Sequence, residues 1–336
     1  MNLELLELIV KKALDFADGE CNFAFQGGEP TLAGLDFYKK LVEFEKKYNI
    51  KKVKINNAIQ TNGILIDGNW AEFLASNNFL VGLSLDGTKD INDDLRQDVQ
   101  DRGTFSRIMN AAELFNRYKV EYNILFVVSS SVARHVRSIY SFFSKKNFRY
   151  LQFIPCIEPL NEKPGGYNFS LTPDMFAIFL KTLFDLWYED IRKGNYISIR
   201  YFDNLIDILA GQQPEICGMS GNCSCQIIVE SNGGVYPCDF YVIDEWYLGN
   251  IKDKGFEELK YCENGKRFVE ASKPIDPECL ECKWMNLCKG GCRRYREPFT
   301  EGLPQLNYYC QSYKEFFEYA APRLQYIESI FRGVTA

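Results

Sequence analysis

The sequence has a single histidine, His135, among its 336 residues. Catalytic zinc and mononuclear iron sites usually take two or three imidazoles, and Ser-His or Cys-His catalytic pairs need at least one. No site of these kinds can be assembled here except around His135 itself. That residue lies in SSVARHVRSIYSFF, which predicts a helix, so we expect a surface or packing role for it.

Two further features are missing, a surplus of positive charge and a long apolar run. The formal net charge is −6, which argues against a nucleic-acid partner. No apolar run reaches the roughly 18 residues that a membrane span needs. The first residues, MNLELLELIVKKALDF, predict an amphipathic helix and no signal peptide. We therefore expect a cytoplasmic protein with neither nucleic acid nor a membrane among its partners.

Over residues 1–155, short β-branched or aromatic segments alternate with helical patterns. The segments that predict strands are CNFAFQG (21–27), VKINNAIQT (53–61), FLVGLSLDG (79–87), VEYNILFVVS (120–129) and RYLQFIPC (149–156). The stretches that predict helices are 32–48, 69–77, 104–119 and 133–147. Strand, helix and strand at this spacing are typical of parallel βαβ units, so the predicted fold class is α/β.

Glycine and polar residues follow the predicted strands. In parallel βαβ units the functional groups gather at the C-terminal ends of the strands, although ordinary turns favour the same residue types. The residues concerned are Gly27, Gly28, Glu29, Thr61, Asn62, Gly63, Ser84, Asp86, Gly87, Ser129 and Ser130. Any single loop fits a site or a plain turn equally well, whereas the combination favours a site.

The composition changes in the second half of the chain. Residues 157–175 form an irregular connection, and helices are predicted over 173–194 and 200–211. Most of the twelve cysteines come after residue 212. We expect a first domain over 1–211, a second over 212–325 and a C-terminal tail over 326–336.

The second domain is marked by closely spaced cysteines. CLECKWMNLCKGGC (279–292) has the spacing Cys-X2-Cys-X5-Cys-X3-Cys. Other cysteines lie before and after it, at Cys217, Cys223, Cys225, Cys238, Cys262 and Cys310. In a reducing compartment such cysteines indicate metal or redox chemistry and not disulfides. Clustered thiolates select zinc, Cu(I) or iron–sulfur clusters, and the spacing alone leaves zinc and iron–sulfur both open.

Four cysteines stand apart from the rest. Cys21 and Cys156 lie far from the cysteine block and are expected to be packed thiols. Cys225 and Cys262 lie within the second domain and are expected to be spare.

The cysteine block, together with QGGEPTLAGLDFY (26–38) and YPCDFY (236–241), closely resembles the anaerobic sulfatase-maturating enzymes. These are radical S-adenosylmethionine (SAM) proteins with a C-terminal SPASM domain, and the likeness covers almost the whole chain. The resemblance implies a radical SAM (β/α)6-type barrel, here partial and without its first strand. A small cysteine-rich α+β SPASM domain follows it.

The resemblance also implies two auxiliary [4Fe–4S] clusters. The ligands of the first are expected to be Cys217, Cys223, Cys238 and Cys292. The ligands of the second are expected to be Cys279, Cys282, Cys288 and Cys310. The family likeness thus favours iron–sulfur over zinc.

The family's SAM contacts have counterparts as well. They are Gln26, Gly27, Gly28, Glu29, Ser84, Arg96 and Ile157. Arg96 suits the SAM carboxylate because a guanidinium binds carboxylates bidentately, although its setting, INDDLRQDVQD, by itself favours a surface charge in a polar loop. Asp239 matches the family's catalytic base; the alternative is a carboxylate that caps a turn or tunes the cluster beside Cys238.

One family motif is missing from this sequence. Radical SAM enzymes carry Cys-X3-Cys-X2-Cys after the first strand, where it binds the [4Fe–4S] cluster that cleaves SAM. No such spacing occurs here, so this third cluster lacks ligands, and the chain as written is expected not to cleave SAM. We expect truncation and not decay, because the other motifs are intact; an open reading frame upstream of Met1 that encodes the three cysteines would support this.

For the complete protein, the resemblance implies oxidation of a Cys or Ser in an unfolded sulfatase segment to Cα-formylglycine. A 5′-deoxyadenosyl radical would take a hydrogen from the substrate Cβ, Asp239 would take the thiol or hydroxyl proton, and the electron would leave through an auxiliary cluster. A flavodoxin or ferredoxin is the expected electron donor. Three alternatives remain: modification of another peptide such as a ribosomally made precursor, a non-catalytic electron-transfer protein, and a zinc-stabilised peptide-binding module.

Overall fold

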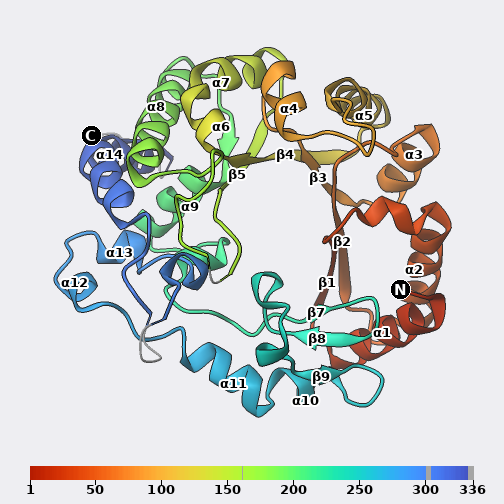
Figure 1. Ribbon diagram of the computed structural model, residues 1–336. Coiled ribbons are helices and arrows are strands. Elements are labelled where there is room, and N and C mark those ends of the chain that lie inside the picture. The colour runs from red at the N-terminus through yellow and green to blue at the C-terminus, as the bar shows by residue number, and fades with distance from the viewer. Residues whose placement is uncertain (161, 300–303, 332–336) are drawn as a thin grey trace. The chain divides into compact units, whose positions relative to one another are not determined.

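A computed structural model describes residues 1–160, 162–299 and 304–331. The chain divides into two compact units. Figure 1 labels their helices and strands. Unit 1 comprises Met1–Ser84, Ser106–Tyr122 and Ser224–Glu270, and unit 2 comprises Leu85–Phe105, Asn123–Cys223 and Ala271–Ala336. These units are defined by contacts between residues. The domains expected over 1–211 and 212–325 follow from composition, so the boundary at residue 212 stays a prediction.

Unit 1 contains strands and helices from the N-terminal half and a small sheet from the cysteine-rich part. In the first group are α1 (Leu3–Phe16), β1 (Glu20–Phe25), η1 (Pro30–Ala33), α2 (Leu35–Tyr48), β2 (Lys54–Thr61), α3 (Gly68–Ser76), β3 (Leu80–Ser84) and nearly all of α5 (Phe105–Tyr118). In the second group are β7 (Ile228–Val229), β8 (Gly234–Tyr236), η3 (Asp239–Tyr241), η4 (Asp244–Trp246), β9 (Gly249–Asn250), α10 (Phe256–Lys260) and α11 (Glu263–Glu270).

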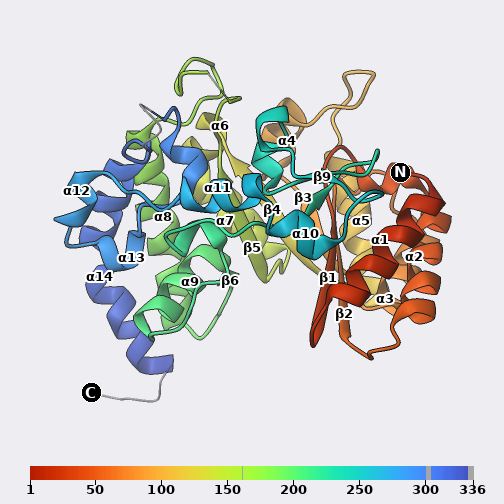
Figure 2. The ribbon, with the colours of Figure 1, turned by 90° about the horizontal axis from the view of Figure 1, so that it is seen from below.

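Unit 2 contains the remaining strands of the large sheet and most of the cysteines. Its earlier elements are α4 (Lys89–Leu95), most of β4 (Glu121–Val128), α6 (Ser130–Arg134), α7 (Val136–Lys145), β5 (Tyr150–Pro155), α8 (Pro173–Arg192), β6 (Ser198–Ile199) and α9 (Arg200–Leu209). Its later elements are η2 (Cys217–Met219), α12 (Pro277–Leu280), α13 (Met285–Cys288), η5 (Arg293–Arg296) and α14 (Cys310–Phe331), and Figure 2 shows the same ribbon from below.

The large sheet consists of six parallel strands in chain order, β1 to β6. Within unit 1, β1 pairs with β2 from Glu20↔Lys54 to Phe25↔Ile59, and β2 pairs with β3. Within unit 2, β4 pairs with β5 and β5 with β6. Parallel neighbours need a crossover, and the chain supplies helices for it. The α/β class predicted from the sequence is therefore confirmed.

The predicted elements agree with the structure, with three corrections. The expected helix over 133–147 is two helices, α6 and α7, which meet at the exposed His135. The polar segment around Arg96, expected to be a loop, contains the helix α4. Residues 326–331 of the expected tail belong to α14, while 332–336 lie outside the described residues.

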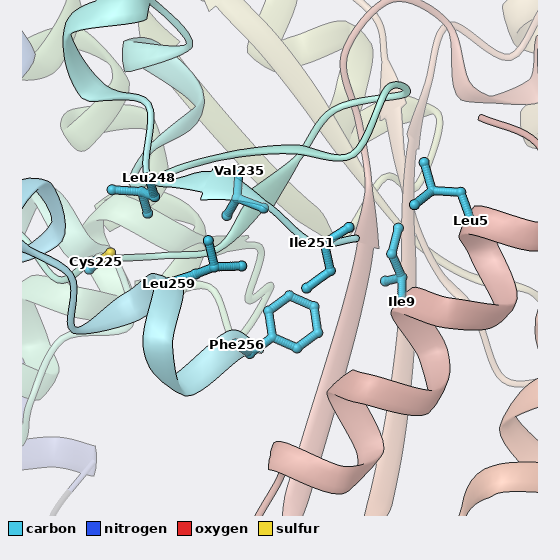
Figure 3. Packing of buried hydrophobic residues seen from close by; sticks show 8 residues of the cluster. All are labelled: Leu5, Ile9, Cys225, Val235, Leu248, Ile251, Phe256 and Leu259. Atoms are coloured by element: carbon cyan, nitrogen blue, oxygen red, sulfur yellow. The ribbon is translucent and has the colours of Figure 1, made fainter. Parts of the chain in front are cut away.

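The first helix packs on the cysteine-rich part of unit 1 (Figure 3). Leu5 and Ile9 of α1 join a cluster whose other members are Cys225, Val235, Leu248, Ile251, Phe256 and Leu259. Lys12 donates hydrogen bonds to the carbonyl oxygens of Ile251 (2.6 Å) and Lys254 (2.8 Å). Segments more than 200 residues apart in sequence thus share one core.

Aromatic side chains fill the core of unit 2, between α8, α9 and α14. Its fully buried members include Phe176, Phe179, Phe184, Trp187, Phe202 and Phe316. The Trp187 indole donates to the carbonyl of Ile197 at 2.8 Å, which satisfies its one polar group. In the described residues, no helix is both long and apolar enough to cross a bilayer.

Candidate functional site

The loop that follows β1 contains the predicted SAM residues Gln26, Gly27, Gly28 and Glu29. Gly27 (φ +86°) and Gly28 (φ +57°) have left-handed backbone conformations that side chains disfavour. These conformations are the structural reason for glycine at both positions. This loop therefore presents bare backbone at the end of a parallel strand.

Glu29 orders two neighbouring loops through its carboxylate. Its Oε1 accepts hydrogen bonds from the backbone N (3.0 Å) and Oγ1 (2.6 Å) of Thr31 and from Oγ1 of Thr61 (2.7 Å). Its Oε2 accepts one from the backbone N of Asn62 at 2.8 Å. Each carboxylate oxygen has about two lone-pair positions, so Oε2, which accepts from Asn62 N alone among these four donors, has room for one more. The loops after β1 and β2 are thereby tied together, and the predicted SAM contact of Glu29 would use the remaining position.

Ser84, another predicted SAM contact, is buried at the end of β3 and accepts a hydrogen bond from Gln60 Nε2 at 3.0 Å. A Cβ on Gly82 would lie 1.9 Å from Gln60 Oε1, so any larger residue at position 82 would force the Gln60 side chain out of this position. Gln60 is not among the site residues predicted from the sequence. The glycine inside a strand was the available signal, because it marks a close approach.

In unit 2, Arg96 is paired with Asp86, a residue at the end of the third predicted strand. Arg96 donates from Nε to Oδ2 of Asp86 at 2.6 Å and from Nη2 to Oδ1 at 3.3 Å. Val127 N also donates to Asp86 Oδ1, at 2.9 Å, and the Asp86 side chain is only 5% exposed. Arg96 is not an isolated surface charge: a buried carboxylate orients it, and its other N–H groups are left for a second acceptor.

Ile157, the last predicted SAM contact, is half-buried in unit 2 just after β5. The segment around it is fixed at several points. Tyr295 donates its hydroxyl to the carbonyl of Pro155 at 3.1 Å, and the buried Glu158 accepts hydrogen bonds from Gly165 N (2.8 Å) and Ser170 Oγ. The irregular stretch after β5 is therefore held by side-chain contacts and not by regular secondary structure.

Asp239, the predicted base, begins η3 in unit 1 and is exposed. Gln26 Nε2 donates to its Oδ2 at 3.0 Å. Its Oδ1 accepts from Phe240 N at 3.1 Å and from Cys238 Sγ at 3.3 Å. The structure thus brings together a predicted SAM contact, Gln26, and the predicted base, Asp239.

Four cysteines of unit 2 surround one cavity. Cys279, Cys282, Cys288 and Cys310 line one pocket of unit 2, together with apolar side chains such as Trp284 and Phe317. Burial raises the pKa of the Cys288 thiol to about 12 and that of Cys310 to about 11. A bound cluster would have to displace these protons, because thiolates are the ligands. Four cysteine sulfurs around one pocket are the type and number of ligands that the second predicted [4Fe–4S] cluster needs.

Three more predicted ligands come together in unit 2. A Cβ on Gly218 would lie 3.1 Å from Cys292 Cβ, so Cys292 lies directly beside Gly218, which follows Cys217 in the sequence. Burial raises the pKa of Cys292 to about 12, and the charges of Cys217 and Cys223 add to the shift. The fourth predicted ligand, Cys238, belongs to unit 1. Among the residues that the structure describes, no group of three or more His, Cys, Asp or Glu side chains is arranged to hold a metal ion.

Comparison with known families defines the class of protein. The model of the radical SAM superfamily matches residues 1–137, and that of the SPASM iron–sulfur cluster-binding domain matches residues 217–283. This chain is therefore a radical SAM protein with a SPASM domain. The two domains indicate SAM and iron–sulfur clusters as cofactors.

Relatives narrow the class to one family. A cysteine-type anaerobic sulfatase-maturating enzyme of Clostridium perfringens is 55% identical over 96% of this chain and 88% of its own. The enzyme of the same type from Clostridium novyi is 49% identical over 97% of this chain and 87% of its own. A solved structure of native anSMEcpe with bound AdoMet and the Cp18Cys peptide is 54% identical, with a TM-score of 0.97 over 98% of this chain and 92% of that chain.

The chain belongs to the anaerobic sulfatase-maturating enzymes. The resemblance deduced from the cysteine block and the QGGEP segment is thus confirmed, and family membership supports an enzymatic role. The individual ligand, SAM-contact and base assignments stay predictions.

Proposed function

We propose that this protein oxidises a cysteine of a sulfatase peptide to Cα-formylglycine by SAM-dependent radical chemistry. The observation that carries the proposal is the hydrogen bond between Gln26 and Asp239, which brings a carboxylate to the loop expected to bind SAM. The choice of cysteine over serine is supported by the names of the two relatives, both cysteine-type. The peptide-bound neighbour supports a peptide as the substrate.

The chain's own residues divide the task into binding and proton transfer. When bound, SAM and its cluster supply the radical that removes one hydrogen atom from the substrate Cβ. SAM carries an ammonium group and a carboxylate. The ammonium group suits the open backbone at Gly27 and Gly28 and the free acceptor position on Glu29 Oε2. The carboxylate suits the guanidinium of Arg96. Asp239 would accept the thiol proton, since its carboxylate is exposed and oriented from two sides.

Two auxiliary [4Fe–4S] clusters would complete the chemistry. Cys279, Cys282, Cys288 and Cys310 would hold one of them in the cavity they line. Cys217, Cys223, Cys238 and Cys292 would hold the other, which would place a cluster beside Asp239 through its neighbour Cys238. Removal of a hydrogen atom and a proton from the substrate leaves one electron to be accepted, and these clusters are the proposed acceptors. The resulting thioaldehyde would then react with water, which supplies the aldehyde oxygen and releases the sulfur as hydrogen sulfide. A flavodoxin or ferredoxin would supply the electron that SAM cleavage consumes.

A peptide assay tests the proposal. The chain would be prepared as written and also preceded by a segment with the Cys-X3-Cys-X2-Cys motif, both reconstituted with iron and sulfide under anaerobic conditions. Each preparation would receive SAM, a reductant and a sulfatase-derived peptide with Cys, Ser or Ala at the target position. We expect an aldehyde trapped by a hydrazine from the Cys peptide in the motif-containing preparation, and none from the Ala control.

Two results would contradict the proposal. Cleavage of SAM without aldehyde in any peptide would assign the protein to another reaction. Efficient modification of an unrelated precursor peptide, with none of the sulfatase peptide, would assign it to another substrate.

A further inference from the structure

Two thiols in the Ser224–Glu270 part of unit 1 belong to neither predicted set of cluster ligands. Cys225 is 8% exposed and lies in the segment before β7, among Leu248, Leu259 and other apolar side chains (Figure 3). Cys262 directly precedes α11, is half-buried and packs against the same cluster. The chain therefore brings a buried and a partly accessible thiol into one core.

Both sulfurs lie near the same glycine, Gly265. The backbone N of Gly265 donates to Cys262 Sγ at 3.4 Å, within the 4 Å range of sulfur hydrogen bonds. A Cβ on Gly265 would lie 3.5 Å from Cys225 Sγ and 2.4 Å from the carbonyl oxygen of Lys260. Glycine at position 265 thus allows the start of α11 to come close to the Cys225 sulfur. Cys225 and Cys262 therefore both lie close to Gly265, a residue without a side chain.

We propose that Cys225 and Cys262 form a reversible intramolecular disulfide when the protein meets a low-molecular-weight disulfide such as oxidised glutathione. Cys262, the accessible thiol, attacks one sulfur of the oxidant as the thiolate and releases one glutathione. Cys225 then attacks the Cys262 sulfur of the mixed disulfide and releases the second glutathione. Two thiol protons leave to solvent or glutathione, and two electrons reduce the oxidant. A dithiol reductant reverses both steps.

The Cys225–Cys262 disulfide would close a loop of the chain that contains predicted functional residues. Residues 225–262 include β7, β8, η3 and β9, and with them Cys238 and Asp239. A cross-link lowers the conformational freedom of the unfolded chain, so it raises the stability of the folded form. The oxidised protein should therefore retain the fold around Asp239 at temperatures that unfold the reduced protein.

Oxidant titration with peptide mapping tests this inference. The reconstituted full chain would be incubated anaerobically with increasing oxidised glutathione, alkylated and digested for mass spectrometry. We expect a linked peptide pair containing Cys225 and Cys262, two glutathiones released per disulfide, and reversal by dithiothreitol. Cys262→Ser should abolish the linked pair. Cys21→Ser, which changes a half-buried thiol outside the pair, should leave its yield unchanged.

Two other outcomes would overturn the inference. One is a stable glutathione adduct on Cys262 with Cys225 still free, and the other is no reaction of either thiol at a concentration that oxidises a surface cysteine peptide. A second measurement does not depend on how the variants fold. The melting temperature of the unmutated protein should rise on oxidation and return on reduction while its iron content stays constant, and no rise would also count against the disulfide.

Discussion

Gln26 donates a 3.0 Å hydrogen bond to Asp239, a residue 213 positions further along the chain. The contact joins the glycine-containing loop after β1 to the segment that follows β8, both in unit 1. A carboxylate fixed on one oxygen by Gln26 and on the other by Phe240 N has a defined orientation. This orientation is what a base must have to accept a proton from a bound substrate.

Asp239→Asn should leave both auxiliary clusters in place and lower aldehyde formation by at least about a hundredfold, because general-base catalysis typically contributes that much. The measurement is the initial rate with the Cys peptide in the motif-containing preparation, alongside iron content. Asp244→Asn is the matched control, since Asp244 is also an exposed acid on a short helix of unit 1. Undiminished turnover of Asp239→Asn would remove this residue from the mechanism.

Gln26→Leu should lower turnover by about tenfold, equivalent to about 1.4 kcal/mol, because it removes the donor that orients Asp239. The dissociation constant for SAM should not change, since the Gln26 amide is directed to Asp239. In an Asp239→Asn background the substitution should have little further effect, as expected for two residues that act together. A loss of SAM binding that matches the loss of turnover would instead assign the Gln26 side chain to SAM.

Arg96→Ala should destabilise the protein by about 3 kcal/mol, because it leaves the buried Asp86 carboxylate without its ion-pair partner. The free energy of unfolding in urea measures the effect. The control is Arg192→Ala, whose pair with Glu189 has both side chains at least half exposed and should contribute less than about 0.5 kcal/mol. Equal small losses in both variants would show that the Arg96–Asp86 pair does not stabilise the fold.

The buried carboxyl of Glu45 should make the free energy of unfolding depend on pH. Its side chain is 5% exposed, Oε2 accepts from Asn57 at 3.1 Å and Oε1 has no hydrogen-bond partner. Burial raises the pKa of Glu45 to about 7, against 4.5 for the ordinary carboxyl, and the Asn57 hydrogen bond opposes the shift. The folded state therefore binds this proton more tightly than the unfolded state. The resulting stability is complete below pH 4.5 and is lost as the pH rises to about 7.

The loss should reach about 3 kcal/mol above pH 7, from about 1.4 kcal/mol per pH unit. Glu45→Gln should remove this dependence and be more stable than the unmutated protein at pH 8 but not at pH 4. Urea unfolding of both proteins across this range is the measurement. A stability difference that does not vary with pH would mean that Glu45 is ionised or solvated in the folded state.

Metal content tests the cluster assignments. We expect about eight irons and eight sulfides per chain as written, from two four-iron clusters, and no stoichiometric zinc. Cys310→Ser should remove about half of the iron because Cys310 lines the cavity of the second predicted cluster. Cys21→Ser should remove none. Zinc without iron would exclude the radical reaction, and about twelve irons would require a third cluster from other cysteines.

The sequence by itself determined the types of most elements and the class of cofactor. Strand and helix periodicity is a local property, so the strands β1 to β5 and the long helices α2, α5 and α8 were predicted within a few residues. Cysteine spacing is equally local and indicated thiolate-bound metal. The helix α4 was missed because its segment lacks an apolar pattern. It is held by Asn92, which is fully buried and accepts a hydrogen bond from Asp86 N at 3.2 Å.

Only the tertiary structure decided which side chains act together. The pairing of Arg96 with Asp86, the four hydrogen bonds of Glu29 and the contact of Gln26 with Asp239 each join different segments of the chain. The same holds for Cys225 and Cys262, which meet at Gly265. Such pairs depend on how strands and loops pack, because hydrogen bonds and ion pairs require separations of about 3 to 4 Å that sequence distance does not set.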